Sequence, residues 1–383
     1  AMSSPTVPSS MKAWQCAGYD KELSLADGLP VPSPGIAEVL VNVHYAAVDP
    51  LDWNLLAGQC KDRFHLSFPF VPGFDVAGEV VAVGPECSKL AVGDRVSLCL
   101  GPSESCSKDT TFGPAGALAE YCVCPEEQIS KVPDTVLLSA VAGLPLAGLT
   151  AYQALFTGSG ASTTGEPLGD VQEASDVFKQ ALSTGTGAST TGDVQEASKV
   201  LVLGGDRGTG HLAVQMAKAK GAVVVATVSP GKVQWMENIG ADLVINIKEQ
   251  DWLQLLKGQN FDLILDCVGW AASTDEMDRA VQLMLPGGQF IGITNFAALE
   301  AAGTRGGCSF KAMVPKVTSK DLDVLVEWAA SGRLEVFEDR VCPFSEAGRA
   351  LQQGVSRYGK VIICQCNVTS GGVPCRHAAG GGA

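Results

Sequence analysis

The first third of the chain alternates short apolar runs with turns. Apolar runs cover residues 39–43, 76–83 and 117–123, and glycine or proline residues separate them. Short runs at this spacing predict β-strands of a barrel-like domain. The turn at 92–94 is expected to lead into one more strand, while helical periodicity stays weak until about residue 137.

Beyond residue 137 the pattern changes to alternating helix-like and strand-like segments. Residues 137–156 show helical spacing with few charged side chains. The expected helices are 211–220 and 231–239, and the expected strands are 199–203, 222–228, 242–246, 261–267 and 289–293. This order predicts a parallel, doubly wound sheet with right-handed crossovers, so the predicted fold class is α/β. The chain is expected to finish with helices 320–331 and 346–355 and strand 360–365.

The segment 157–199 interrupts this pattern with an internal duplication. The hexapeptides GASTTG and DVQEAS each occur twice in it, and its side chains are mostly small and polar. Such a composition cannot build a core of its own, which predicts a mobile surface insertion. A lid with two short helices remains an alternative. Residues 1–10 and 367–383 are expected to be disordered.

Composition and charge argue against two classes of protein, nucleic-acid binders and membrane-spanning proteins. The chain has 383 residues, which suits one large or two ordinary domains. Its 41 acidic and 27 basic residues give a net charge of −14, which argues against a nucleic-acid partner. The sequence contains no apolar run of about 18 residues, so we expect no membrane span.

The cysteines indicate the compartment. Thirteen cysteines are scattered along the chain without regular spacing, which predicts free thiols in a reducing environment. The first ten residues lack the apolar region of a secretory signal. We therefore predict a cytoplasmic protein, and an organelle stroma or matrix after removal of a transit peptide remains an alternative.

The segment 200–213, VLVLGGDRGTGHLA, is the strongest chemical motif in the chain. It combines a buried strand, a glycine-rich turn and the start of a helix inside a βαβ unit. Glycines let the backbone approach a pyrophosphate closely, and the first turn of the following helix offers free N–H groups. The motif predicts a dinucleotide site.

The end of the second strand of this unit indicates which dinucleotide is bound. An NAD site usually places an acidic residue there, but this chain has none until Glu237. Ser229 and Lys232 instead suit a 2′-phosphate, and Arg207 is a second candidate cation. The predicted cofactor is NADP(H).

Seven sequence motifs, spread over most of the chain, resemble those of a known protein family. They are VDPLDW at 48–53, FPFVPGFDVAGEV at 68–80, VGDRV at 92–96, GALAEYCV at 116–123, LPLAGLTAYQAL at 144–155, FDLILDCVG at 261–269 and SRYGKVI at 356–362. In this order they resemble the zinc-independent medium-chain dehydrogenase/reductases, especially the branch of quinone oxidoreductases and alkenal/enone reductases. Apart from the insert, the resemblance runs from Met11 to about Cys364.

The resemblance implies a domain organisation and a cofactor site. It implies a GroES-like catalytic domain from 11–136 and 310–366 around a Rossmann domain at 137–309, with NADPH in the cleft and a homodimer formed through the edge of the Rossmann sheet. Trp53 and Phe74 are expected to shape the substrate pocket. The residues expected to bind the cofactor are Asp49, Thr150, Gly205, Asp206, Arg207, Gly208, Thr209, Ser229, Lys232, Cys267, Val268, Ile293 and Lys360.

The chain also departs from the family's pattern. Arg207 stands where the turn usually has a glycine, and Asp49 and Asn54 replace an asparagine and a lysine. Phe74 occupies the position of a histidine ligand in the zinc-dependent relatives. Because catalytic zinc needs three protein ligands, the predicted metal content is none.

Without a metal, an activated C=C bond or a quinone is the expected hydride acceptor, because its conjugation spreads the added charge. The candidate catalytic residues are Tyr45, Asp49 and Tyr358, although Asp49 is expected chiefly to accept a bond from the cofactor ribose or to orient its loop. The predicted function is NADPH-dependent reduction of a small electrophile, a quinone or an α,β-unsaturated carbonyl compound. An enoyl-thioester reductase and a non-catalytic NADPH-binding scaffold remain alternatives.

Overall fold

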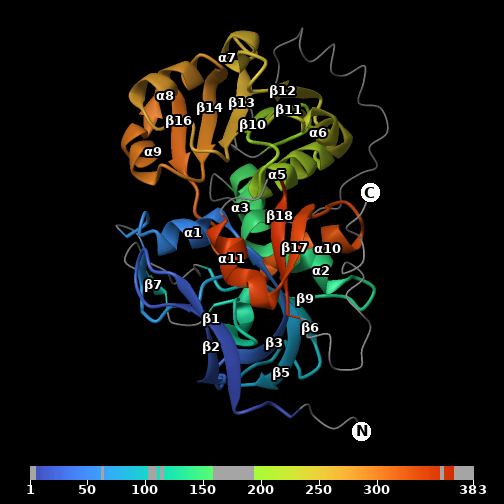
Figure 1. Cartoon of the computed structure of the whole chain (residues 1–383). Helices are drawn as coiled ribbons and strands as arrows, with labels where there is room; N and C mark the ends of the chain where they lie inside the picture. The colour runs from blue at the N-terminus through green and yellow to red at the C-terminus, as the bar shows by residue number, and fades with distance from the viewer. Residues whose placement is uncertain are drawn as a thin grey trace.

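The computed structural model of the chain describes residues 6–61, 64–101, 110–112, 116–157, 194–353 and 358–365. It has two sheet-based halves with helices between and around them (Figure 1). The predictions for 1–5, for most of the 157–199 insert and for 367–383 lie outside the described residues. None of the helices in the described ranges combines the length and the apolar character of a membrane span.

One half is built on a seven-stranded, mostly antiparallel sheet. Its order is β17-β18-β3-β5-β6-β9, with β8 also paired to β3. The strands are β3 (Glu38–Val48), β5 (Asp75–Val83), β6 (Arg95–Cys99), β8 (Tyr121–Pro125), β9 (Ile129–Lys131), β17 (Glu338–Pro343) and β18 (Lys360–Cys364). Two small sheets add β1 (Ser10–Cys16) with β2 (Leu23–Pro30) and β4 (Phe64–Leu66) with β7 (Thr110–Phe112).

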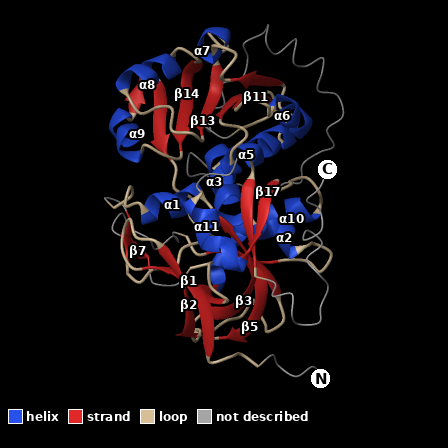
Figure 2. Ribbon diagram, viewed as in Figure 1, coloured by secondary structure: helices blue, strands red, loops and turns tan. Residues whose placement is uncertain are grey.

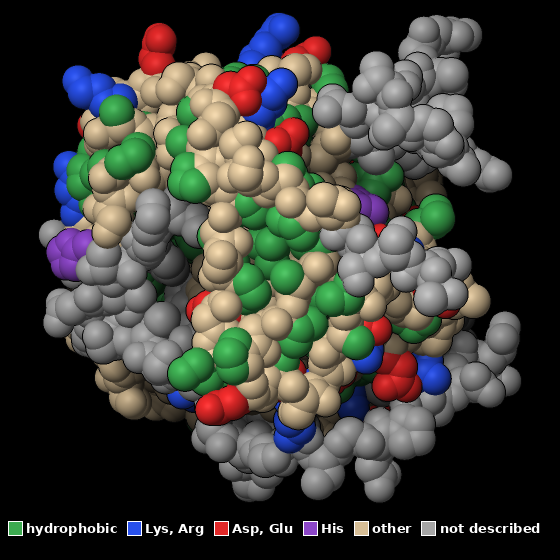
Figure 3. Space-filling model, turned by 90° about the horizontal axis from the view of Figure 1, so that it is seen from below, with side chains coloured by type: hydrophobic (Ala, Val, Ile, Leu, Met, Phe, Trp, Pro, Cys, Tyr) green, Lys and Arg blue, Asp and Glu red, His purple; other side chains and the backbone are tan. Residues whose placement is uncertain are grey.

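Short helices complete this half, which is the part expected from the sequence to be catalytic and is called the catalytic domain below for that reason alone. They are α1 (Pro50–Leu56), α2 (Leu138–Ala142), α10 (Ser319–Ala330), α11 (Ala347–Gln352) and the 3₁₀ turns η1 (Glu126–Gln128) and η2 (Phe344–Glu346). Seen from below, the molecule shows apolar side chains across the centre of its face (Figure 3). Large exposed apolar residues of this domain include Leu25, Ile36 and Val92, which belong to different elements. Scattered exposure of this kind is usual for a folded protein and marks no site by itself.

The other half contains a second seven-stranded sheet, with the order β12-β11-β10-β13-β14-β16-β15. All pairings are parallel except that of β15 with β16. The strands are β10 (Lys199–Leu203), β11 (Val223–Val228), β12 (Leu243–Asn246), β13 (Phe261–Asp266), β14 (Met284–Gly292), β15 (Thr304–Arg305) and β16 (Cys308–Ala312). The helices are α3 (Pro145–Phe156), α5 (Gly208–Ala219), α6 (Val233–Ile239), α7 (Trp252–Leu255), α8 (Thr274–Val281) and α9 (Phe296–Ala302).

Alternate residues of β10 explain why this sheet is buried on both faces. Val200 and Val202 belong to one core cluster with Leu212 of α5, whereas Leu201 belongs to a second cluster with Met277 of α8. Helices therefore cover the two faces separately, as Figure 2 shows. A parallel sheet with covered faces is the doubly wound Rossmann arrangement, so the predicted α/β fold is confirmed.

Three local features differ from what the sequence pattern alone indicates. The region before residue 137 contains the helix α1, which is only seven residues long and so gives little periodicity. The expected helix at 137–156 is broken into α2 and α3, because Pro145 has no N–H to donate to the carbonyl of Val141. The strand expected over the run 117–123 forms only from Tyr121, as β8, whereas the run 39–43 lies within β3, which ends just before Pro50 and reaches the site described next.

Candidate active site

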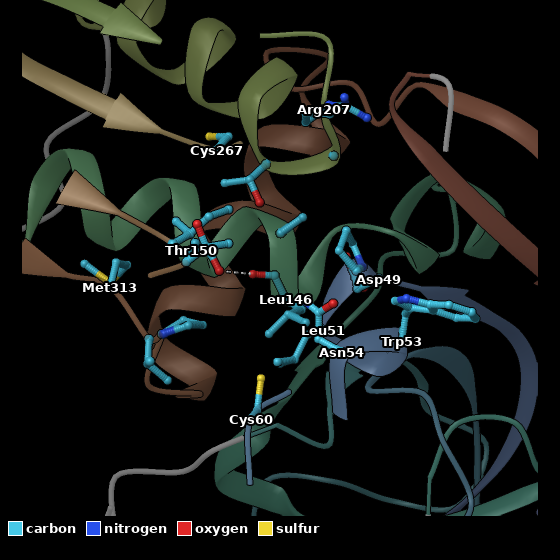
Figure 4. A pocket seen from close by; sticks show the side chains of 18 of the residues that line it. Asp49, Leu51, Trp53, Asn54, Cys60, Leu146, Thr150, Arg207, Cys267 and Met313 are labelled. Carbon is cyan, nitrogen blue, oxygen red and sulfur yellow. Dashed lines mark hydrogen bonds between the residues drawn. The ribbon is translucent and has the colours of Figure 1, made fainter. Parts of the chain in front are cut away.

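A cavity of about 900 Å³ lies between the two domains. It opens at the carboxyl ends of β10 and β13, where the chain returns to the centre of the sheet after running outward through β11 and β12. Ligands bind at such topological switch points in open α/β sheets. In Figure 4, Cys267 and Arg207 lie at the top of the pocket, Cys60 at the bottom, Met313 on the left and Asp49 on the right.

The glycine-rich turn after β10 is held tightly against β11. The N–H groups of Gly204 and Gly205 donate to the side chain and the carbonyl of Thr227, at 3.0 and 2.8 Å. Gly204 has a φ of +78°, and a Cβ on Gly210 would lie 2.1 Å from the carbonyl oxygen of Gly204. These positions require glycine, so the first turn of α5 can approach a bound phosphate closely.

The loop after β13 is shaped by a residue that sequence reasoning missed. The buried carboxylate of Asp266 accepts three hydrogen bonds, from the N–H groups of Val268, Gly269 and Ala271, at 2.9–3.0 Å. This places Cys267 and Val268 on the wall of the cavity, and Val268 is 47% exposed although it is apolar. An aspartate before a short glycine-containing loop was the available signal, because such side chains commonly bind nearby backbone N–H groups.

Four of the expected cofactor residues lie beside the cavity and do not line it. Asp206 is 1% exposed, and its carboxylate accepts a hydrogen bond of 3.2 Å from the N–H of Ser229. The ammonium group of Lys232 lies 3.9 Å from the centre of the Tyr358 ring. Gly205 packs behind the turn, where a Cβ would lie 2.9 Å from Ala226.

Ten predicted residues do line the same cavity, and three others do not. The aromatic ring of Phe74 is 2% exposed within the core of the catalytic domain, so its assignment to the substrate pocket is corrected. Tyr45 lies on β3 and Tyr358 lies beneath Lys232, and neither lines the cavity. Trp53 lines the edge of the cavity with its ring extending outward (Figure 4). The predicted residues that line it are Asp49, Trp53, Thr150, Arg207, Gly208, Thr209, Cys267, Val268, Ile293 and Lys360.

The cavity wall contains a buried cluster of charged side chains. The ammonium group of Lys360 lies 2.5 Å from Oδ1 of Asp49 and 3.0 Å from Oδ2 of Asp75. Asp52 lies beside them and is fully buried. Lys360 itself is only 2% exposed. Sequence reasoning singled out Asp49 and Lys360 separately but missed that Asp52 and Asp75 complete one cluster with them.

Strand register explains how this cluster forms. Val361 of β18 pairs with Val48 of β3, which puts Lys360 beside Asp49 at the end of that pair. Asp75 begins β5, where it pairs with Ala47 on the other side of β3. Three strands distant in sequence therefore bring their charged ends together at the cavity.

The pKa values of the buried carboxyl groups are raised. Burial, with the negative charge of Asp49 nearby, raises the pKa of Asp52 to about 7. Burial also raises the pKa of Asp75 to about 8, although the ammonium group of Lys360 opposes the shift. Burial disfavours the charged forms of the Asp52 and Asp75 carboxyl groups, which is why both pKa values lie near or above neutral pH.

The neutral imidazole of His211 connects α5 to the catalytic domain. Its Nδ1–H donates to the carbonyl of Arg207 at 3.0 Å, and its Nε2 accepts from the N–H of Phe337 at 3.2 Å. Both ring nitrogens are engaged, and burial lowers the pKa of His211 to about 4. His211 is therefore a structural residue here and not a catalytic base.

When the pH falls, the free energy of unfolding of the His211→Gln variant is expected to decrease less than that of the unmodified protein. The folded-state pKa of about 4 lies below the usual 6.5, so the unfolded chain binds the proton first. The stability that neutral His211 provides is present above pH 6.5 and is lost as the pH falls toward 4. The difference between pH 7 and pH 5 should be about 2 kcal/mol in urea unfolding. The exposed histidine His65, changed to glutamine, is the matched control; an equal pH slope in the unmodified protein and H211Q would contradict the expectation.

The cluster does not fit a zinc ion. Zinc in proteins is bound mainly by cysteine and histidine, with an open position at catalytic sites. Here the cation among the carboxylates is the ammonium group of Lys360, and Phe74 supplies no ligand atom. Among the residues that the structure describes, no group of three histidine, cysteine or acidic side chains could hold a metal ion.

Comparison with known proteins assigns the chain to a family. Residues 35–134 match the alcohol dehydrogenase GroES-like domain, and residues 239–363 match the zinc-binding dehydrogenase model. The 2-methylene-furan-3-one reductase of Solanum lycopersicum is 30% identical over 369 residues, which cover 94% of this chain and 80% of the relative. The chain belongs to the medium-chain dehydrogenase/reductase family.

Further comparisons support this assignment to the medium-chain dehydrogenase/reductase family. The chloroplastic quinone-oxidoreductase QR1 of Triphysaria versicolor is 28% identical over 347 residues, covering 88% of this chain and 92% of the relative. The structure of the quinone oxidoreductase from Coxiella burnetii shares the fold, with a TM-score of 0.71 at 23% identity over 93% of this chain and 99% of that one. The predicted resemblance is confirmed, and the protein is an oxidoreductase of a family that uses nicotinamide cofactors.

Proposed function

We propose that the protein is an NADPH-dependent reductase that transfers hydride to a quinone or to the C=C bond of an α,β-unsaturated carbonyl compound, without a metal ion. The observation that carries this proposal is the interdomain cavity, whose wall holds the ammonium group of Lys360 between the carboxylates of Asp49 and Asp75. The printed names of the relatives from Triphysaria and Solanum support the same substrate classes.

The residues present fit a dinucleotide. The turn from Gly204 to Gly210 has the close backbone contacts that leave room for a pyrophosphate, and Arg207 offers a guanidinium group at the cavity. Thr150, Cys267 and Ile293 would flank the nicotinamide at the carboxyl end of the sheet. When bound, NADPH supplies the hydride ion for the reaction.

The remaining walls suit a conjugated, mostly apolar electrophile. Apolar side chains exclude water, which strengthens electrostatic interactions inside the cavity. Hydride addition leaves negative charge on the substrate, and the basic side chains on the described wall, Arg207 and Lys360, can stabilise it. The apolar side chains that line this part of the cavity include Leu51, Leu146, Ala147, Phe296 and Met313.

The preference for NADPH rests on the end of β11. Ser229 and Lys232 lie there and can bind a 2′-phosphate. The carboxylate of Asp206, in the turn after β10, also lies at the end of β11. The sequence of β11 alone did not indicate this contact. The carboxylate of Asp206 is buried and already accepts a hydrogen bond from the N–H of Ser229, so it is not available to accept one from a ribose hydroxyl.

We expect Lys232→Ala to weaken NADPH binding by about 10- to 100-fold, the value of one charge-assisted bond, and to leave NADH binding nearly unchanged. Titration of protein fluorescence with each nucleotide measures both dissociation constants. Lys257→Ala removes an exposed lysine that follows α7 in the chain, and it serves as the control. Equal affinities for the two nucleotides before mutation would contradict the assignment to NADP(H).

The activity is tested by mixing purified protein with NADPH and following its absorbance with three acceptors. A quinone or a short enone should be reduced. Reduction of an enoyl thioester alone would identify the enoyl-thioester reductase alternative. Tight NADPH binding without oxidation by any acceptor would support the scaffold alternative and refute the proposal.

We also infer a homodimer, formed through the edge of the parallel sheet at β15, and a cytoplasmic or organellar location. The short edge strand β15 is paired only with β16 in the described sheet, which leaves one side available for a second copy. The relative from Triphysaria carries a chloroplastic name, which supports keeping the organelle as an alternative. Light scattering during size-exclusion chromatography measures the assembly state.

A further inference from the structure

The ammonium group of Lys232 lies over an aromatic ring and not beside a carboxylate. It is 3.9 Å from the centre of the Tyr358 ring, and the lysine itself is half-buried. Among the residues that the structure describes, no acidic side chain forms an ion pair with Lys232. A ring face attracts one side of an ammonium group and neutralises no charge, so the cation remains available to an anion.

The Tyr358 ring is itself held by other aromatic side chains. The ring of Trp235 on α6 meets it edge to face, with the ring centres 5.3 Å apart and the planes at 63°. Trp235 also packs against Phe337 at 5.4 Å, and Phe337 packs against His211 at 5.9 Å. Contacts of this kind restrict the Tyr358 ring, and the cation over its face is restricted with it.

The backbone beside Tyr358 is bonded to the glycine-rich turn after β10. The N–H of Gly359 donates to the carbonyl of Asp206 at 3.0 Å, and the carboxylate of Asp206 accepts from the N–H of Ser229 at 3.2 Å. Tyr358 directly precedes β18 of the catalytic domain, and it thereby reaches the end of β11. In Figure 1, α6 and β17 face each other across this border between the two halves.

The ring changes what a phosphate gains from Lys232. A long lysine side chain loses conformational entropy when a bound phosphate fixes it in one position. The contact with Tyr358 restricts Lys232 before any phosphate binds, and the N–H bonds on the far side of the ammonium group can still donate. A group that is already in its bound position gives a higher affinity for the same contact.

We propose that Tyr358 is a positioning residue of the 2′-phosphate site: its ring holds the ammonium group of Lys232 in place and so favours NADPH over NADH. This inference rests on the proposed NADPH-dependent function and deepens it. The ring acts through Lys232, and the Tyr358 hydroxyl group is not required. Because Tyr358 belongs to the catalytic domain, both halves of the molecule take part in selecting the nucleotide.

Two substitutions at Tyr358 separate the ring from the hydroxyl group. In Tyr358→Leu the dissociation constant of NADPH should rise about 5-fold, the value of one cation–π contact, while that of NADH changes by less than about 2-fold. Tyr358→Phe keeps a ring under Lys232 and should bind NADPH within about 2-fold of the unmodified protein. An equal loss in both variants would assign the effect to the hydroxyl group and overturn the proposal.

Two nucleotides without a nicotinamide give a readout besides activity. Adenosine 2′,5′-bisphosphate and adenosine 5′-monophosphate differ only in the 2′-phosphate, and calorimetric titration measures the affinity of each. Tyr358→Leu should weaken the bisphosphate alone. Equal weakening of both nucleotides would show that the substitution displaces the turn after β10, and the proposed positioning role would then be wrong.

A double variant tests whether Tyr358 acts through Lys232. If it does, the variant with both Lys232→Ala and Tyr358→Leu binds the bisphosphate as tightly as Lys232→Ala alone, because the ring has no cation left to hold. Losses that multiply in the double variant would show that the two residues act independently. That result would contradict the inference.

Tyr19→Leu is the matched control. The ammonium group of Lys61 lies 4.4 Å from the centre of the Tyr19 ring, so this substitution removes another contact of the same kind. Neither Tyr19 nor Lys61 lines the interdomain cavity. We expect Tyr19→Leu to keep the preference of the unmodified protein for the bisphosphate.

Nuclear magnetic resonance tests the contact in the unmodified protein. With ¹³C at the ε-carbon of lysine, the ring current of Tyr358 should shift the Lys232 protons upfield, and the signal is assigned by its loss in Lys232→Ala. The upfield shift should persist when the bisphosphate is bound. Its disappearance on binding would mean that the ammonium group leaves the ring to reach the phosphate, which would overturn the proposal even if Tyr358→Leu does not fold.

The failure of this inference and that of the proposed cofactor give different results. Equal affinities of the unmodified protein for NADPH and NADH would refute both. A preference for NADPH that is retained in full by Tyr358→Leu would refute the role of Tyr358 alone and leave the proposed function standing.

Discussion

Replacing Lys360 with methionine is expected to lower the free energy of unfolding by about 3–5 kcal/mol, the usual cost of removing one partner from a buried ion pair. The ammonium group of Lys360 is the cation between Asp49 and Asp75, and all three side chains are at least nine-tenths buried. Without it two carboxylates face each other in a low-dielectric site. Urea unfolding above pH 8, where the Asp75 carboxyl has lost its proton, measures the change.

Two further variants separate this effect from general damage. Arg305→Met breaks the ion pair with Asp278, in which the side chains are 36% and 51% exposed, and should change stability little. Adding Asp75→Asn to Lys360→Met should restore part of the lost stability, because it removes one of the unpaired charges. A Lys360→Met variant that unfolds at the same urea concentration as the unmodified protein would contradict the assigned burial of the cluster.

Replacing Gly210 with alanine is expected to cost about 3 kcal/mol, at the upper end of overpacking effects, and to abolish measurable nucleotide binding. The new Cβ would lie 2.1 Å from the carbonyl oxygen of Gly204 and 2.9 Å from the Cα of Gly205. Both are backbone atoms that cannot rotate away, so the first turn of α5 must shift from its place behind the turn. Thermal unfolding and NADPH titration measure the two effects.

Gly18→Ala is the matched control for this substitution. A Cβ at Gly18 would meet only Lys21, at an ordinary distance of 3.6 Å. We expect its stability and nucleotide binding to match those of the unmodified protein. Unchanged NADPH affinity in Gly210→Ala would mean that the turn does not hold the pyrophosphate.

The fold could be predicted from the sequence because most strands and helices have their own local hydrophobic pattern, and these patterns alternate along the chain. The alternation of strands and helices after residue 199, with the glycine-rich turn after β10, was sufficient for the doubly wound sheet. The helix α1 could not be predicted from periodicity, since two turns hold too few residues. The break before Pro145 follows from its missing N–H, a signal present in the sequence but outweighed by apolar spacing on both sides.

The site was predicted in part, for a different physical reason. Residues that follow strands, such as Cys267 and Arg207, could be placed at the cavity because parallel strands bring their carboxyl ends to one edge. The Asp49–Lys360–Asp75 contacts depend on the register of antiparallel strands separated by hundreds of residues, which no local pattern encodes. Phe74 was misplaced because a single residue on a strand end can turn toward the core or the cavity with equal local preference.

The connection between α5 and the catalytic domain limits how the molecule can admit a substrate. Besides the His211 contact, the side chain of Gln215 exchanges two hydrogen bonds with the backbone of Glu335, and the N–H of Gly359 donates to the carbonyl of Asp206. These bonds tie the two halves along one border, beside β17 in Figure 1. A hinge motion that leaves them intact must widen the opposite side, between α1 and α9. Small molecules would then enter and leave the cavity between α1 and α9, while the end at the glycine-rich turn stays closed.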